Sequence, residues 1–254
     1  MGRVPRTVFA LANQKGGVGK TTTAVNLAAC LADAGEPVLV VDLDPQANAT
    51  SGLGERANGT SSYDLLDGAP LESLAKPTRF GNLHLVPSKP ELAGAAVELS
   101  LRDDGERFLA EALDGRTARF SFVFLDCPPS LCPLTVNALA AADAVLVPVQ
   151  AEYYALEGLS QLLDSVELVR RRLNPRLAVA GVLLTMVDRR TRLSAEVEAD
   201  VRRHLGNLVF ETTVPRSVRL AEAPSHGLPV IAYDRRSAGA EAYWKVAMEL
   251  AERS

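Results

Sequence analysis

A glycine-rich segment near the N-terminus contains the residue types that bind phosphate groups. Residues 12–22 read ANQKGGVGKTT, and they lie between an apolar run typical of a buried strand and a segment with helical character. Glycines let backbone N–H groups turn toward phosphate oxygens, and a helix N-terminus adds the positive end of its dipole. Lys20 can offer its charge to the β- and γ-phosphates, and the Thr21 hydroxyl can reach Mg²⁺. We therefore predict a nucleotide-binding loop formed by Lys15, Gly16, Gly17, Val18, Gly19, Lys20, Thr21 and Thr22.

Acidic side chains end two later apolar runs. Asp42 and Asp44 close the segment VLVVDLD, and strand alternation would place them on the same side. Asp126 ends the run FSFVFLD, in the manner of the carboxylate that ATPases present to Mg²⁺. We expect a magnesium site at Thr21, Asp42, Asp44 and Asp126, although Asp42 and Asp44 could instead only cap the following turn. A site that binds phosphate, binds a metal ion and positions water is suited to phosphoryl transfer. We therefore predict the transfer of a phosphoryl group to water.

The order of the apolar and amphipathic segments predicts an α/β fold. Short β-branched runs alternate with helical patterns, which is typical of a doubly wound, mostly parallel sheet with helices on both faces. Its length and composition favour one domain over residues 1–254. The expected strands are Thr7–Ala12, Pro37–Val41, Leu83–Val86, Phe120–Leu125, Ala144–Val149, Leu177–Leu184 and Leu208–Val214. The expected helices are Thr21–Ala34, Tyr154–Leu173, Ser194–Leu205 and Gly239–Arg253, with surface loop and short helix over residues 55–79.

Charge and cysteine content exclude several classes of protein. A net charge of −4 argues against coating nucleic acid or anionic membrane through bulk charge, so any DNA contact must come from a local patch. The three cysteines lack paired spacing, which favours reduced thiols in a cytoplasm. No apolar run approaches the ~20 residues of a membrane-spanning helix, and we expect neither an exported nor an integral membrane protein.

The phosphate loop departs from the usual G-x-x-x-x-G-K-[ST] pattern in an informative way. Gln14 occupies the place of the first glycine, and an additional lysine stands at Lys15. This sequence resembles the deviant Walker A motif K-G-G-x-G-K-[ST] of the ParA/MinD family of ATPases. The resemblance extends over nearly the whole chain, including residues 150–159, 214–216 and 224–227, and is strongest to the chromosomal ParA (Soj) branch.

The resemblance implies roles for individual residues in a slow ATPase that uses ATP and Mg²⁺. Lys15 would act across a dimer on the partner's nucleotide, and Lys20 would act on the nucleotide bound by its own chain. Asp44 would position or activate the attacking water. Pro215 and Arg216 would contact the adenine, although Arg216 could equally be a surface or DNA-facing arginine. The implied catalytic residues are therefore Lys15, Lys20 and Asp44.

The resemblance also implies partners. They are a second copy of the chain, which associates when ATP is bound, double-stranded DNA bound without sequence preference, and a ParB-type protein that stimulates hydrolysis. The resemblance implies that the chain itself is cytoplasmic and associated with the nucleoid. The candidate DNA contacts are Arg189, Arg192, Arg219 and Arg235, each of which could equally belong to a solvated face balanced by neighbouring acids.

Two relatives in the same superfamily provide alternatives. A MinD-like membrane-associated cell-division ATPase needs a basic amphipathic C-terminal helix, and residues 239–254 have no excess of basic side chains. The nitrogenase iron protein holds an iron–sulfur cluster on suitably placed cysteines. Cys127 and Cys132 flank the turn that follows the strand ending at Asp126, and Cys127 adjoins that acid. We therefore interpret the two cysteines as not being cluster ligands, and we expect no iron–sulfur cluster.

Overall fold

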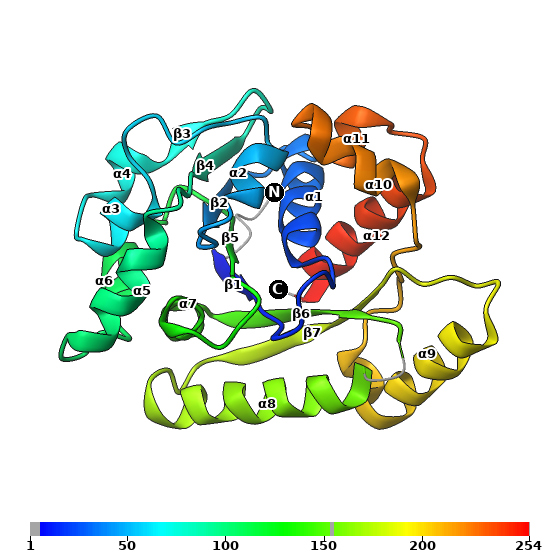
Figure 1. Cartoon of the computed structure of the whole chain (residues 1–254). Helices are drawn as coiled ribbons and strands as arrows, with labels where there is room; N and C mark the ends of the chain where they lie inside the picture. The colour runs from blue at the N-terminus through cyan, green and yellow to red at the C-terminus, as the bar shows by residue number, and fades with distance from the viewer. Residues whose placement is uncertain (1–5, 153–154, 254) are drawn as a thin grey trace.

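A single seven-stranded sheet organises the computed structural model, which describes residues 6–152 and 155–253. The strands are β1 Thr7–Leu11, β2 Val38–Asp42, β3 Lys76–Pro77, β4 Leu83–Val86, β5 Phe122–Asp126, β6 Ala144–Gln150 and β7 Ala178–Thr185. Their order across the sheet is β3-β4-β2-β5-β1-β6-β7. All neighbouring pairs are parallel except β3 with β4. The predicted fold class, a doubly wound and mostly parallel sheet, is confirmed (Figure 1).

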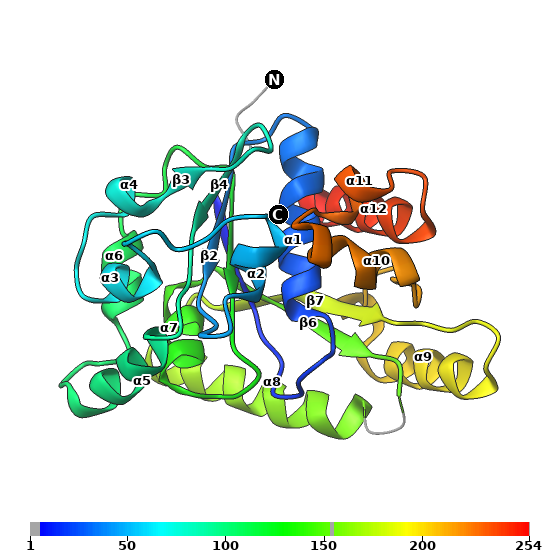
Figure 2. The ribbon, with the colours of Figure 1, turned by 45° about the horizontal axis from the view of Figure 1, so that its top comes forward.

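Helices cover both faces of this sheet. The longer ones are α1 Lys20–Asp33, α5 Leu92–Leu101, α7 Pro133–Ala141, α8 Ala155–Arg172, α9 Arg192–Leu205 and α12 Ala238–Arg253. The shorter ones are α2 Asn48–Gly52, α3 Ser62–Leu66, α4 Leu71–Leu74, α6 Phe108–Leu113, α10 Val218–Glu222 and α11 Val230–Tyr233, with 3₁₀ turns η1 Gly206–Leu208 and η2 Ala223–His226. Figure 2 shows α1, α11 and α12 on one side of the sheet, with α3 to α7 on the other. Among the described residues, no helix is long and apolar enough to cross a membrane.

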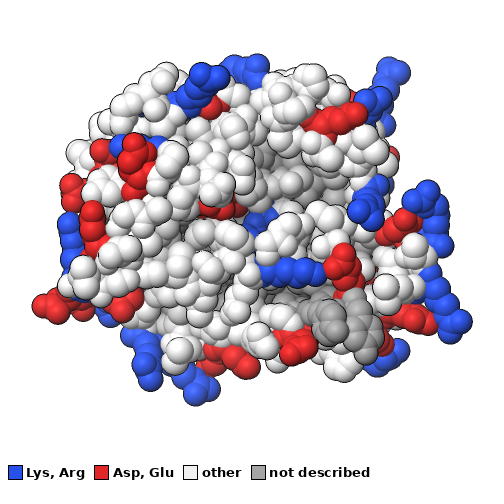
Figure 3. Space-filling model, viewed as in Figure 1, with Lys and Arg blue, Asp and Glu red and all other residues white. Residues whose placement is uncertain are grey.

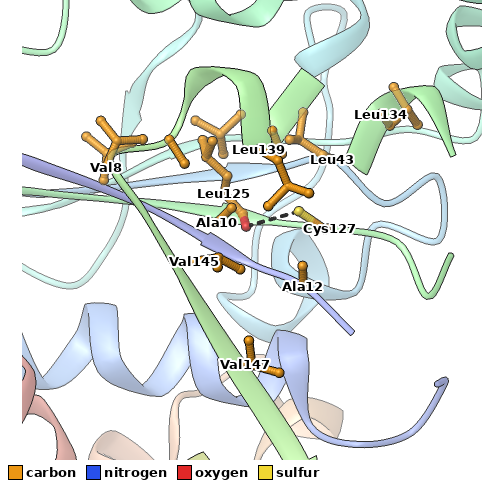
Figure 4. Close-up of a cluster of buried hydrophobic side chains, with 14 of the residues drawn as sticks. Val8, Ala10, Ala12, Leu43, Leu125, Cys127, Leu134, Leu139, Val145 and Val147 are labelled. Carbon is orange, nitrogen blue, oxygen red and sulfur yellow. Dashed lines mark hydrogen bonds between the residues drawn. The ribbon is translucent and has the colours of Figure 1, made fainter. Parts of the chain in front are cut away.

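Strand alternation divides the apolar side chains into two clusters, one for each face. Val8 and Ala10 of β1 belong to the first cluster, whereas Phe9 and Leu11 belong to the second, which packs against α1 and α12. Figure 4 shows part of the first cluster, in which the Cys127 thiol contacts the Leu125 carbonyl oxygen at 3.6 Å. Because both faces are buried, the strands have continuous apolar sequences, and this continuity makes them recognisable in the sequence.

Most of the predicted elements are confirmed. Six of the expected strands and three of the expected helices lie within two residues of their predicted ends. The fourth expected helix corresponds to α8, and its predicted first residue, Tyr154, lies outside the described residues.

The expected strand at Leu208–Val214 is wrong. This segment runs beside β7 but makes only isolated bridges, Val182 with Val209 and Val187 with Pro215. Between them, the backbone N–H groups of Glu211 and Thr212 donate to the carboxylate of Glu249 on α12, at 2.8 and 3.2 Å. A side chain from a distant helix therefore replaces the strand ladder that the β-branched sequence predicts.

Candidate active site

The phosphate-loop residues connect the carboxyl end of β1 to the first turn of α1. Gly17 and Gly19 have φ angles of +75° and +91°, in the left-handed region that favours glycine. Gly19 is the N-cap of α1 and supplies no side chain to that helix end. The positive end of the helix dipole therefore faces the loop without a capping side chain, which is the arrangement that binds anions.

Residues from β6 and β7 hold the loop in place. The Thr185 hydroxyl, at the end of β7, donates to the Val18 carbonyl oxygen at 2.8 Å. The Asn13 amide donates to the Pro148 carbonyl oxygen at 2.7 Å, and its own oxygen accepts the N–H of Lys15 at 3.0 Å. The loop is therefore positioned by the two strands beyond β1.

Lys20 occupies the centre of the site. Its side chain is buried, and Nζ donates to the Lys15 carbonyl oxygen at 3.3 Å. Burial lowers the pKa of Lys20, while the negative charges of Asp126 and Asp44 act in the opposite direction. The lysine is thus held at the loop with acidic groups beside it.

Two aspartates lie side by side below the loop. Asp42 and Asp126 are paired in register on β2 and β5, and both are completely buried. Asp42 accepts the N–H and the hydroxyl of Thr50 at 2.8 and 2.7 Å, and the N–H of Asp44 at 3.1 Å. Burial nevertheless raises the pKa of Asp42 to about 6.

Asp126 differs from Asp42 because neither of its carboxylate oxygens has a hydrogen-bond partner of good geometry among the described residues. Burial raises its pKa well above the ordinary value, the neighbouring Asp42 adds to this shift, and Thr21 and Lys20 oppose it. A buried carboxylate without partners is costly unless a cation or donor neutralises it. This orphaned group beside a threonine hydroxyl fits the oxygen ligands and charge that Mg²⁺ requires.

The structure brings Asp42 and Asp126 into one cluster with Thr21, in which both aspartates are completely buried and Thr21 is partly exposed. No group of three or more His, Cys, Asp or Glu side chains within residues 6–152 and 155–253 is arranged as a complete metal cage. Mg²⁺ usually takes only one or two carboxylates and completes its shell with phosphates and water. The cluster therefore fits a cation that arrives with a nucleotide.

Asp44 lies in the turn after β2 and also acts as a cap. Its carboxylate accepts the N–H of Gln46 at 2.9 Å, and its carbonyl oxygen accepts the Ser88 hydroxyl at 2.7 Å. Turn capping by Asp42 and Asp44, the alternative considered from the sequence, is therefore present. The Asp44 charge still acts on the pKa of Lys20, which places this carboxylate near the phosphate loop.

The additional lysine of the loop points toward solvent. The Lys15 side chain is 52% exposed, and Nζ pairs with a carboxylate oxygen of Glu152 at 2.8 Å. The other oxygen of Glu152 accepts the Gln150 amide at 2.5 Å. Lys15 is thus held at the surface of the loop, away from the buried aspartates.

Pro215 and Arg216 lie at the same edge of the sheet as the loop. Pro215 forms a bridge with Val187, and the N–H of Arg216 donates to the Val187 carbonyl oxygen at 3.2 Å. Val187 is two residues beyond Thr185, the loop anchor. The segment that contains Pro215 is therefore attached to the strand that holds the loop.

The arginines proposed for DNA contact lie outside this cluster and differ in their pairing. Arg192 pairs with Glu196 at 2.7 Å and Arg219 with Glu222 at 2.9 Å, while Arg235 pairs with Asp33. The Arg189 side chain makes no ion pair with a described residue. On the face shown in Figure 3, basic side chains gather mostly at the periphery, many beside acidic ones.

Sequence reasoning missed Thr50, Thr185 and Glu152. Thr50 binds Asp42, Thr185 anchors the loop, and Glu152 pairs with Lys15. Thr185 and Glu152 lie at or just after the carboxyl ends of β7 and β6, where ligands bind in such sheets. Extending the search for polar residues to every strand end would have found these two.

Comparisons with known proteins agree with this geometry. A family model described as an AAA domain matches residues 6–179. The chromosome-partitioning ATPase Soj of Thermus thermophilus is 57% identical over 96% of this chain and 95% of its own length. The sporulation initiation inhibitor protein Soj of Bacillus subtilis is 52% identical over 96% of this chain and 98% of its own length.

A solved structure supports the assignment of the cofactors. Cobyrinic acid a,c-diamide synthase of Mycobacterium smegmatis, with bound ADP and magnesium, superimposes with a TM-score of 0.83 and 37% identity, over 96% of this chain and 94% of its own. The activity in that name belongs to that protein, and the two Soj proteins are considerably more similar in sequence. ATP and Mg²⁺ are the cofactors, and the chain belongs to the Soj/ParA family of chromosome-partitioning ATPases.

Proposed function

We propose that this chain is a partitioning ATPase that dimerises on ATP, binds double-stranded DNA without sequence preference and is stimulated by a ParB-type partner. The observation that carries the proposal is the orphaned Asp126 carboxylate beside Thr21 and Lys20, at the first turn of α1. The names of the Soj relatives supply the partitioning role. In the cell we expect the protein in the cytoplasm, associated with the nucleoid.

Each residue of the site receives a role in hydrolysis. Lys20 binds the β- and γ-phosphate oxygens, where phosphate charge offsets the burial that lowers its pKa. Thr21 and Asp126 would hold Mg²⁺, with Asp42 supporting the site from the neighbouring strand. When bound, Mg²⁺ neutralises charge that develops on the transferring phosphoryl group. Asp44 positions the attacking water.

Lys15 is proposed to act on the nucleotide of a second copy. Its side chain is half exposed, and its ion pair with Glu152 lies in solvent. Exposed pairs of this kind contribute about 0–1 kcal/mol, so exchanging Glu152 for a partner's phosphate costs little. A charge that reaches the site only in the dimer couples dimerisation to phosphoryl transfer.

Pro215 and Arg216 are proposed to contact the adenine. Their attachment to β7 beyond Thr185 supports this role, because the same strand positions the phosphate loop. Nucleotide binding would then bring the loop and this segment onto one ligand.

The arginine contacts to DNA are proposed to differ in strength. Arg189 is available directly, whereas Arg192, Arg219 and Arg235 would exchange carboxylate partners for phosphates. Because these pairs are surface exposed, phosphates can compete with them, and dimerisation doubles the number of contacts.

The deciding experiment measures binding to nonspecific duplex DNA with ATP, with ADP and without nucleotide, across a salt titration. We expect binding only with ATP, falling steeply as salt rises. Lys20→Ala should bind neither nucleotide nor DNA, and Arg189→Ala should weaken DNA binding while nucleotide binding is retained.

A parallel arm uses sedimentation with anionic phospholipid vesicles. ATP-dependent binding to vesicles, with no DNA binding in any nucleotide state, would replace the partitioning role by a MinD-like membrane role. ATP binding and hydrolysis would remain assigned to the same residues in that case.

A further inference from the structure

A cavity of about 350 Å³ lies at the end of the sheet opposite the phosphate loop. Its walls are the residues that lead into β1, helix α6 and the turn after it, the last turn of α7, and the turn between α8 and β7. The five residues of β1 separate this cavity from the loop by roughly 16 Å. The cavity is therefore distinct from the nucleotide site, and the inference below does not depend on the proposed function.

Three arginines line the cavity. The Arg6 guanidinium donates to the hydroxyl of the buried Thr117 at 2.9 Å. The side chains of Arg107 and Arg176 make no hydrogen bond or ion pair with any residue of the described ranges. A guanidinium carries five N–H donors in a planar fork that matches a carboxylate. Two complete sets of donors are thus available at this surface.

Negative groups line the same cavity. Asp143 is already engaged, since its carboxylate accepts the N–H of Val8 at 2.8 Å. Glu111 and Asp114 have no side-chain partner among the described residues, although the free arginines line the same space. The last turn of α7 adds the negative end of a helix dipole.

Charged side chains of both signs line this one cavity without pairing with each other. Elsewhere, some arginines pair with nearby acids, as Arg192 does with Glu196 and Arg203 with Asp200, and others, such as Arg189, make no ion pair with a described residue. In the cavity, none of the three arginines forms an ion pair with Glu111, Asp114 or Asp143. A simple anion would be repelled by Glu111 and Asp114, and a simple cation by the arginines.

We propose that the cavity binds a small zwitterion that carries a carboxylate and an ammonium group. The carboxylate binds Arg107 and Arg176, and the ammonium group binds Glu111, Asp114 and the carbonyl end of α7. The volume is at the small end of the range for ligand pockets, which suits a molecule of amino-acid size.

The wall of the cavity is preorganised. The buried Asn174 amide donates to the carbonyl oxygens of Leu139 and Ala142, at 3.0 and 2.7 Å, and so ties the end of α7 to the turn before β7. The Asn174 oxygen accepts the N–H of Arg176 at 3.3 Å. A ligand therefore meets a backbone frame that is already in place, and the ordering cost of binding is confined to the exposed side chains.

The test uses the full chain saturated with ADP and Mg²⁺, so that the phosphate loop is occupied. Ligand-observed NMR and calorimetry at low salt measure the binding of γ-aminobutyrate, with butyrate and butylamine as probes that carry one charge each. We expect γ-aminobutyrate to bind saturably in the millimolar range and each single-charge probe to bind at least tenfold more weakly.

Matched variants locate the binding. Arg107→Gln combined with Arg176→Gln, and separately Glu111→Gln, should each weaken γ-aminobutyrate binding at least tenfold. Arg236→Gln, at an exposed arginine that does not line this cavity, should not. All of these side chains are exposed, and unchanged melting temperatures confirm folding. Absence of saturable binding, equal binding of butyrate, or equal affinity in the cavity variants would overturn the proposal.

Discussion

The carboxylates of Asp42 and Asp126 occupy paired positions on adjacent parallel strands, and both are completely buried. Three hydrogen bonds support Asp42, whereas Asp126 has none of good geometry among the described residues. The protein therefore keeps an unfavourable group where a nucleotide-bound cation can neutralise it. We therefore expect stability and ligand binding to be coupled at this point of the fold.

The stability of the protein without nucleotide and Mg²⁺ should decrease as pH rises. Burial raises the folded-state pKa of Asp42 from 3.8 to about 6, so the folded state binds more protons than the unfolded state between these values. Asp42 alone should cost up to about 3 kcal/mol of unfolding free energy across this window. Urea unfolding at a series of pH values measures the slope, and a rise in stability with pH there would contradict the raised pKa.

Replacing Asp126 by asparagine should separate stability from activity. Asp126→Asn removes a buried charge beside Asp42. Without ligand it should therefore raise the unfolding free energy by about 1–2 kcal/mol, and the melting temperature with it. The same change should abolish Mg²⁺-dependent ATP hydrolysis. Calorimetry and a phosphate-release assay measure both, and a less stable variant that hydrolyses ATP normally would exclude this role.

Thr185→Val should weaken the hold on the phosphate loop, although Thr185 lies 167 residues from Val18 in the sequence. The substitution preserves the shape of the side chain but leaves the buried Val18 carbonyl oxygen without its donor. We expect nucleotide affinity to fall by about 1–2 kcal/mol, roughly tenfold, by titration with ADP. Thr60→Val is the control, since the Thr60 hydroxyl has no partner among the described residues. Equal nucleotide affinity in the two variants would show that the hydrogen bond from Thr185 to Val18 does not contribute to nucleotide binding.

Gly16→Val should test the dimer without disturbing the isolated chain. A Cβ at Gly16 meets only Pro129, at an ordinary 3.8 Å, and the backbone there does not require glycine. We therefore expect a nearly unchanged melting temperature. Gly16 is exposed and follows Lys15, which is proposed to reach the second copy, so a larger side chain here should obstruct the ATP-dependent dimer measured by light scattering. Gly81→Val, at a position with open space, should dimerise normally. A normal Gly16→Val dimer would mean that this position does not face the partner.

Asp44→Ala should distinguish ATP binding from ATP hydrolysis. Because Asp44 is proposed to position the attacking water, its loss should leave a dimer that binds ATP and DNA but releases neither. Single-turnover hydrolysis and dissociation from DNA are the measurements. Hydrolysis at the parental rate would remove this role from Asp44.

Several features of the fold could be predicted because their causes are local. The phosphate loop combines glycines with a helix start, and the buried parallel strands are continuous apolar runs. The segment 208–214 has the same β-branched character, yet it is no strand, because Glu249 takes two of its N–H groups. That carboxylate is supplied by α12, 38 residues from Glu211, and no local pattern reveals it.

The sequence by itself determined the chemistry at the strand ends, namely a lysine and a threonine on a phosphate loop and aspartates after apolar runs. Only the tertiary structure decided which of these groups are neighbours. The sheet order β2-β5-β1-β6-β7 differs from the order along the chain, so it brings Asp126 beside Asp42 and Thr185 beside Val18. Hydrogen bonding between strands distant in sequence, rather than spacing along the chain, therefore assembles the site.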